Sequence, residues 1–182
     1  MRNYTESIAI ASAFREWCHT YLPENREMSV HSQRAYNEAL SLYVAYLNDV
    51  VKITVDALNV NCFSASTIEN WILWLKEKRG CSPVTCNHRL SCLRSFLHYL
   101  SARDIRFLAC ELEARKVKKM RTPKTLPEEI SQEAIANLFK VIDQTSPKGR
   151  RDYTLFYLMY SIAARIDEIL SLKIKTCTLR RG

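Results

Sequence analysis

Glycine and proline are scarce in this 182-residue chain, with only 3 and 5 copies. A β-sandwich or barrel needs many tight turns, which these residues favour, so their scarcity argues against such folds. No apolar run approaches the roughly 18 residues of a membrane-spanning helix. The N-terminal segment also lacks the unbroken apolar stretch of a signal peptide, because Arg15 and Glu16 interrupt it. We therefore expect a helical, cytoplasmic protein without a membrane partner.

The sequence also lacks the patterns of common cofactor sites. It has no glycine-rich phosphate loop and no Cys-x-x-Cys pair, although it contains seven cysteines. The best candidate for zinc is the sequence cluster of Cys81, Cys86, His88 and Cys92. Its irregular spacing is more typical of reduced, buried cysteines in a cytosolic protein. We expect no metal and no cofactor.

The basic charge is concentrated in the middle third of the chain. The net charge is +8, yet residues 1–60 carry 5 basic and 7 acidic side chains. Residues 61–125 carry 13 basic and 5 acidic ones, and residues 126–182 carry 9 and 7. A localised basic field indicates a polyanionic partner, most simply double-stranded DNA, and a solubilising face is the alternative.

Apolar spacings of three and four residues predict a series of helices. The first lies within residues 6–22, with a loop over 23–28, and the second is capped by Ser29. A capping box of Ser66 with Glu69 predicts the start of the third, which ends at Gly80. Ser82 and Pro83 begin a fourth that runs to about residue 100. Its predicted buried stripe is Cys86, Leu90, Leu93, Leu97 and Leu100.

Two of these helices begin with a similar pattern, "SVHSQRAY" from Ser29 and "SPVTCNHR" from Ser82. Each has hydroxyl side chains followed by basic ones, and free backbone N–H groups at a helix N-terminus bind phosphate. Capping alone explains the serines equally well. The flanking basic residues favour DNA. The predicted contacts on these two helices are Ser32, Arg34, Ser82, Thr85, Asn87, His88, Arg89 and Arg94.

The stretch "ARKVKKMRTPKTLP" has six basic residues, no acidic one and two prolines. It is typical of an extended linker between domains, and a solvated connector is the alternative to a strand that follows DNA phosphates. The predicted phosphate contacts here are Arg115, Lys116, Lys118, Lys119, Arg121 and Lys124. Helical patterns resume at "SQEAIANLFKVID" and "RDYTLFYLMYSIAARIDEILSLK".

The order of these segments resembles the tyrosine recombinases, the phage-integrase and Xer group. The family's Ser-x-x-Thr and Leu-x-x-Leu-Arg-x-Phe are matched by Ser82, Thr85 and residues 90–96. Its Arg-x-x-Glu-hydrophobic-Leu-x-Leu is matched by residues 165–172. The resemblance implies an all-α fold of three parts. These are a SAM-like core-binding domain (1–113), a basic linker (114–127) and the first helices of an incomplete catalytic domain (128–182).

The resemblance also implies a role for Arg165, which would contact the scissile phosphate with Glu168 in support. A preorganised guanidinium stabilises the charge that develops when a tyrosine attacks a phosphodiester. From the residues alone, a surface Arg–Glu helix pair is an equal alternative. The family usually has Thr-Gly where this chain has Ile162 and Ala163, and we expect Ala163 to straighten the turn there. "HSQR" from His31 fits His-x-x-Arg but lies in the wrong domain.

The family's later His-x-x-Arg motif and tyrosine nucleophile have no counterpart after Arg165. The terminal "TCTLRRG" also departs from the family pattern. We therefore expect a truncated recombinase that binds DNA, together with other recombinase protomers, and does not cleave it alone. Apolar residues of the last helices, namely Phe156, Tyr157, Met159 and Ile169, are expected to be exposed. The alternatives are a non-enzymatic inhibitor of intact recombinases and a helical protein-interaction module.

Overall fold

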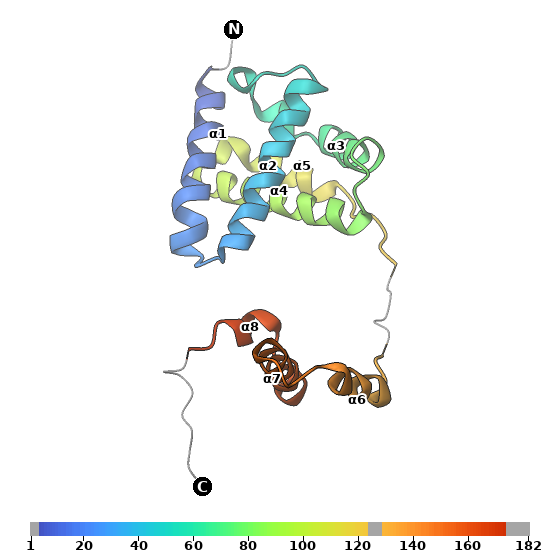
Figure 1. Ribbon diagram of the computed structural model, residues 1–182. Helices are drawn as coiled ribbons and strands as arrows, with labels where there is room; N and C mark the ends of the chain where they lie inside the picture. The colour runs from blue at the N-terminus through green and yellow to red at the C-terminus, as the bar shows by residue number, and fades with distance from the viewer. Residues whose placement is uncertain (1–3, 124–128, 174–182) are drawn as a thin grey trace. The chain divides into compact units, whose positions relative to one another are not determined.

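The computed structural model describes residues 4–123 and 129–173, and the chain forms two compact units, residues 1–124 and 125–182 (Figure 1). Every regular element in these described ranges is helical, which confirms the all-α class. The first unit contains α1 (Tyr4–Glu16), the π-helical η1 (Trp17–Asn25), α2 (Val30–Asp49), α3 (Ala65–Glu77), α4 (Pro83–Arg103) and α5 (Leu108–Lys116). Short 3₁₀ turns are η2 (Val55–Ala57), η3 (Val60–Phe63) and η4 (Ile105–Phe107). The second unit contains α6 (Gln132–Val141), α7 (Pro147–Ile162) and α8 (Ile166–Leu170).

Helix α4 is the central element of the first unit, in contact with α1, α2, α3 and α5. The predicted apolar stripe of α4 is confirmed, since all five of its side chains are at most 1% exposed. Each fully buried leucine contributes about 1.5–3 kcal/mol relative to an exposed one. Because the buried stripe fixes the rotation of α4 about its axis, it also decides which polar side chains face outward.

The predicted caps of α2 and α4 are confirmed. Ser29 Oγ accepts from Ser32 N at 3.2 Å, and Ser82 Oγ accepts from Thr85 N at 3.2 Å. The predicted capping box of Ser66 is wrong, because α3 begins two residues earlier, with Ser64 as its N-cap. Ser64 has the extended backbone that an N-cap requires, and its hydroxyl accepts from the amide of Thr67 at 3.3 Å.

Two segments predicted to be irregular are helical. The predicted loop over 23–28 begins later, because the π-helical η1 continues to Asn25 with Pro23 inside it. Residues 114–116, predicted to begin an extended linker, form the last turn of α5, and Ala114 is buried. The predicted stop of α3 is confirmed, since Gly80 adopts a left-handed conformation (φ +62°) just beyond its end.

The second unit packs α6 on α7 through one aromatic residue. Phe139 of α6 meets the rings of Tyr153, Tyr157 and Tyr160 of α7 at centroid distances of 5.3–6.2 Å. The predicted exposure of apolar side chains is confirmed for Phe156 and Tyr157, which are 38% and 53% exposed. The prediction is wrong for Ile169, which is buried, while Met159 is half-buried.

Candidate nucleic-acid interface

The first turn of α4 brings two predicted site residues together. The hydroxyls of Ser82 and Thr85 lie 3.0 Å apart, and the cap satisfies the amide of Thr85. Pro83 occupies the first helical position and needs no partner for its nitrogen. Ser82 is exposed and Thr85 is half-buried, so the positive end of the helix dipole faces solvent here.

A five-residue segment after α5 lies beside this end of α4. We call residues 117–121 the basic strap, because its exposed side chains are Lys118, Lys119 and Arg121. Asn87 of α4 binds the strap in both directions: its Nδ2 donates to Met120 O and its Oδ1 accepts from Met120 N, each at 2.8 Å. Three cations are therefore held next to the second turn of α4.

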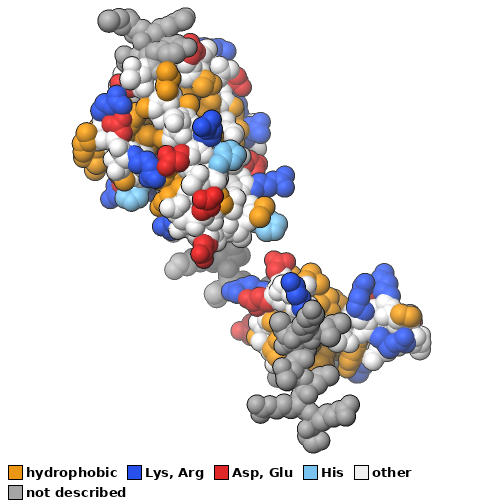
Figure 2. Space-filling model, turned by 90° about the vertical axis from the view of Figure 1, so that its left-hand side faces the viewer, with side chains coloured by type: hydrophobic (Ala, Val, Ile, Leu, Met, Phe, Trp, Pro, Cys, Tyr) orange, Lys and Arg blue, Asp and Glu red, His pale blue; other side chains and the backbone are white. Residues whose placement is uncertain are grey.

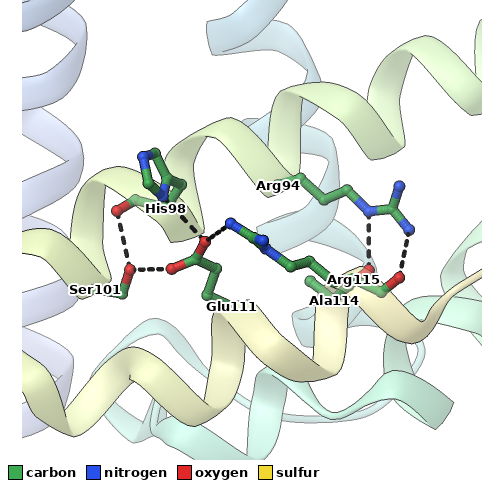
Figure 3. A network of polar contacts seen from close by, with 6 residues as sticks. All are labelled: Arg94, His98, Ser101, Glu111, Ala114 and Arg115. Atoms are coloured by element: carbon green, nitrogen blue, oxygen red, sulfur yellow. Dashed lines mark hydrogen bonds and ion pairs between the residues drawn. The ribbon is translucent and has the colours of Figure 1, made fainter.

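Asn87 and Arg94, both predicted DNA contacts, are turned towards the protein's own backbone. The guanidinium of Arg94 donates from Nε to Ala114 O at 2.9 Å and from Nη2 to Arg115 O (Figure 3). Its Nη2 also donates to Val117 O. Burial and the neighbouring Arg115 lower the pKa of Arg94 from its ordinary value. The side chain caps the C-terminal end of α5.

The other two polar residues of this part of α4 are less enclosed. His88 is exposed, with its Nε2 3.9 Å from Cys92 Sγ. Arg89 is half-buried, and its Nη1 donates to Cys81 Sγ at 2.9 Å. Arg89 therefore already has a partner within the protein, whereas His88 is exposed to solvent.

The second predicted site, at the start of α2, is remote from the first turn of α4. Ser32 is half-buried and Arg34 is exposed on the first turns of α2. Tyr36 of the same stretch packs on Trp17, whose ring also meets Phe96 and Tyr99 in the C-terminal half of α4. The two helix N-termini are thus separated along most of α4, roughly 20 Å at 1.5 Å per residue.

Two predicted phosphate contacts on α5 are paired with acidic side chains. Arg115 forms an ion pair with Glu111, and Lys116 forms one with Glu113. Glu111 is buried and also accepts from His98 Nδ1 at 3.0 Å and from Ser101 Oγ (Figure 3). The hydrogen bonds from Ser101, His98 and Arg115 hold the pKa of Glu111 below its ordinary value of 4.5. Lys124, the last predicted contact of this segment, lies outside the described residues.

Charge is mixed on the face of the first unit that carries α1. Figure 2 shows acidic, basic and histidine side chains interspersed there among apolar ones. Arg15, Glu16 and His19 of α1 and η1 are exposed. The strap has a different composition, because its three exposed side chains are all cationic.

The predicted catalytic pair of the second unit is in contact. Arg165 Nη1 lies 3.1 Å from Glu168 Oε1, and the backbone amide of Arg165 donates to Glu168 Oε2 at 2.8 Å. The side chain of Arg165 is 86% exposed. The expectation that Ala163 straightens the preceding turn is wrong, because Ala163 adopts the left-handed conformation (φ 52°, ψ 29°) that glycine favours. The turn between α7 and α8 is therefore kept.

The candidate zinc cluster does not converge in the described part of the chain. Among residues 4–123 and 129–173, no three histidine, cysteine or acidic side chains are grouped as a metal site would require. The six cysteines in these ranges are free thiols. Burial raises the pKa of Cys18, Cys92 and Cys110 to about 11, so these thiols stay protonated at neutral pH. In the same ranges, no helix is long and apolar enough to cross a membrane.

Comparison with known proteins finds relatives for both units. Residues 16–104 match the family model "Phage integrase, N-terminal SAM-like domain". Tyrosine recombinase XerC of Vibrio cholerae is 28% identical over 167 residues, which are 90% of this chain and 50% of that protein. Tyrosine recombinase XerD of Listeria monocytogenes is 25% identical over 165 residues, 89% of this chain and 52% of that protein. No solved structure matches the chain.

The fold and the matched region define the class of protein: residues 16–104 of the first unit match the SAM-like N-terminal domain of phage integrases, and a second helical unit follows. Residues 16–104 match the integrase domain and relatives called tyrosine recombinases align with about 90% of the chain, which confirms the resemblance drawn from its motifs. It spans about half the length of the curated relatives it matches.

Sequence reasoning missed the residues that fix the strap. Val117 is 2% exposed and Met120 packs against the core, although both lie in a basic segment predicted to be an extended linker. The signal was present, since two apolar residues three apart within a run of cations are typical of a short docked segment. The roles of Asn87 and Arg94 depend on contacts 20 to 33 residues away, which spacing on one helix cannot indicate.

Proposed function

We propose that the chain is the DNA-binding part of a site-specific tyrosine recombinase and that its first unit binds duplex DNA. The single observation that carries this proposal is the position of the strap, which Asn87 binds beside the N-terminal half of α4 and which carries three exposed cations. A helix N-terminus and neighbouring lysines are suited to adjacent phosphates of one strand. The remaining phosphate contacts of this surface come from Ser82, Thr85 and His88. The exposed Arg34 at the start of α2 provides a phosphate contact at a second, separate site.

The relatives support the proposal by their names, since each is called a tyrosine recombinase. In this role Arg165 contacts the scissile phosphate, and the two contacts of Glu168 hold it in place. A recombination site with two half-sites would bring a second protomer onto the same duplex.

The test is the salt dependence of duplex binding by the full chain. Fluorescence anisotropy with a labelled duplex should give an affinity that falls steeply with salt, by about 0.9 log units per log unit for each phosphate contacted. The double variant Lys118→Ala, Lys119→Ala should bind at least about tenfold more weakly and lower this slope by nearly 2.

A matched control removes two charges from elsewhere on the first unit. Arg15→Ala with Lys52→Asn takes away the same net charge, and asparagine tolerates the left-handed conformation of Lys52 (φ 65°). The control should retain the wild-type slope. Equal losses in the two variants would contradict a localised interface, and absence of salt-dependent binding would leave the helical protein-interaction module.

A further inference from the structure

The strap leaves α5 at a point where backbone carbonyls need partners. The last carbonyl oxygens of a helix receive no hydrogen bond from an N–H group of the same helix. A side chain or water must donate to them instead. Arg94, from the middle of α4, donates to the carbonyl oxygens of Ala114 and Arg115 (Figure 3) and also to that of Val117. A guanidinium there is also favourable beside the negative end of the helix dipole. One side chain therefore fixes where α5 ends and where the strap begins.

Asn87 fixes the strap again, further along the chain. Its side-chain amide donates to the carbonyl and accepts from the amide of the same residue, Met120, with both distances 2.8 Å. This is the two-bond pattern that paired residues of neighbouring β-strands exchange. Asn87 and Arg94 lie seven residues, about two helical turns, apart on α4, so they hold the strap along the same side of that helix.

The apolar residues of the strap face the protein and the cations face away from it. Val117 is 2% exposed and Met120 is half-buried against the core, whereas Lys118, Lys119 and Arg121 are exposed. Because Asn87 and Arg94 fix the backbone of the strap, they also fix the direction in which its three cationic side chains point. A free linker of the same composition would present them in many arrangements.

Helix α5 is itself held to α4 by a second polar cluster. Buried Glu111 of α5 accepts from Ser101 and His98 of α4 and pairs with Arg115 on its own helix (Figure 3). Because Arg115 and Lys116 are both occupied in ion pairs on α5, the cations of the strap are the more available partners for an anion.

We propose that Asn87 and Arg94 are positioning residues that hold the basic strap in register with the first turns of α4, and that they do not themselves contact DNA. This inference rests on the proposed function. The strap enters the complex already ordered, so binding does not have to order its backbone. The specificity of the surface for duplex phosphates then comes from the fixed spacing between the strap cations and the α4 N-terminus.

The test combines hydrogen exchange without DNA and binding with DNA, both on the full chain. In the wild-type chain the amide of Met120 should exchange slowly. Asn87→Ala and Arg94→Ala should each speed exchange over residues 117–121 while α4 stays protected, and each should weaken duplex binding about tenfold with an unchanged salt slope. Asn70→Ala, an exposed asparagine on α3, is the matched control and should change neither quantity.

The variant Arg94→Lys distinguishes anchoring of the strap from direct contact with a DNA phosphate. Lysine keeps the charge but cannot reach three carbonyls with a planar fork, so a positioning role predicts that Arg94→Lys behaves like Arg94→Ala. Recovery of affinity by lysine, or a slope reduced by about 0.9 in Arg94→Ala, would show direct phosphate contact and overturn the proposal. Unchanged exchange over the strap in both alanine variants would also overturn it.

Hydrogen exchange tests whether Asn87 and Arg94 anchor the strap, and it does so independently of whether the chain binds DNA. If the wild-type chain binds no duplex, the proposed function fails, yet exchange over residues 117–121 still decides whether the two residues anchor the strap. If the strap loosens in both variants and duplex affinity does not change, the anchoring is real and its role in DNA binding is refuted.

Discussion

Glu111 is a buried carboxylate whose three partners come from two helices. The cluster with Ser101, His98 and Arg115 lowers the pKa of Glu111 below 4.5, so the charged form is favoured in the folded state. A carboxyl with a lowered folded-state pKa contributes stability that is present above its unfolded-state pKa. That contribution is lost as the pH falls through 4.5 and towards the folded-state pKa.

Glu111→Gln should therefore destabilise the first unit by about 2 kcal/mol at neutral pH, because it removes charge-assisted hydrogen bonds in a buried position. The difference from the wild-type chain should shrink steadily below pH 4.5. Urea unfolding between pH 7 and pH 3 measures it, with the exposed Glu38→Gln as control. A difference that does not depend on pH would show that packing, and not ionisation, gives Glu111 its effect.

The sequence predicts contacts between residues close together on one helix better than it predicts backbone conformation or contacts with distant segments. The spacing Arg165-x-x-Glu168 predicted the observed contact, because residues three apart on a helix are neighbours. The conformation of Ala163 was not predictable in the same way, since alanine disfavours positive φ and the surrounding turn overrides that preference. Arg94 looked like a surface cation because its acceptors belong to a helix that begins fourteen residues later.

The helices themselves were easier to predict than their ends. Apolar periodicity located α2, α3, α4, α6 and α7, because each has apolar residues at helical spacing, which α2, α3 and α4 bury in the core. Helix α5 was hidden by charge, since its last turn belongs to the most basic stretch of the chain. The start of α3 was misplaced because Ser64 and Ser66 both precede good helix formers, and only the backbone conformation separates them.

The cap of α4 can be separated from a role in phosphate binding by comparing two helices. Ser82→Ala and Ser64→Ala each remove a cap hydrogen bond and should each cost about 1 kcal/mol of stability. Ser82→Asp retains the cap but places a negative charge at the proposed interface. It should keep wild-type stability and weaken duplex binding, whereas Ser64→Asp should affect neither, as thermal unfolding and anisotropy would measure. Equal binding by the two aspartate variants would count against the α4 site.

At the scale of the whole molecule, residues 114–120 at the C-terminal end of the first unit pack against its core and stabilise it. Ala114 and Val117 are buried, and Arg94 and Asn87 take their partners from residues 114–120. The division into a core-binding domain (1–113), a linker (114–127) and a catalytic fragment (128–182) stays a prediction about function, and the position of these contacts gives it a direct test.

A chain of residues 1–124 should unfold cooperatively on its own, with the melting temperature of the first unit in the full chain. A chain ending at Glu113 should be less stable by several kcal/mol, because it leaves a cavity at Ala114 and Val117 and removes the acceptors of half-buried Arg94. Calorimetry of the two truncated chains and the full chain measures this difference. Equal stability of the two would mean that residues 114–124 contribute nothing to the fold.

The two hydrogen bonds between Asn87 and Met120 have a mechanical consequence. The chain passes from the strap towards the second unit, so a pull transmitted from that unit reaches α4 at Asn87 before it reaches the apolar core. The first contacts to break under tension would be this pair, and Lys118 and Lys119 would lose their fixed positions while the bundle remained intact. Tension between the two units would thus weaken the proposed contacts of Lys118 and Lys119 with DNA phosphates, without unfolding either unit.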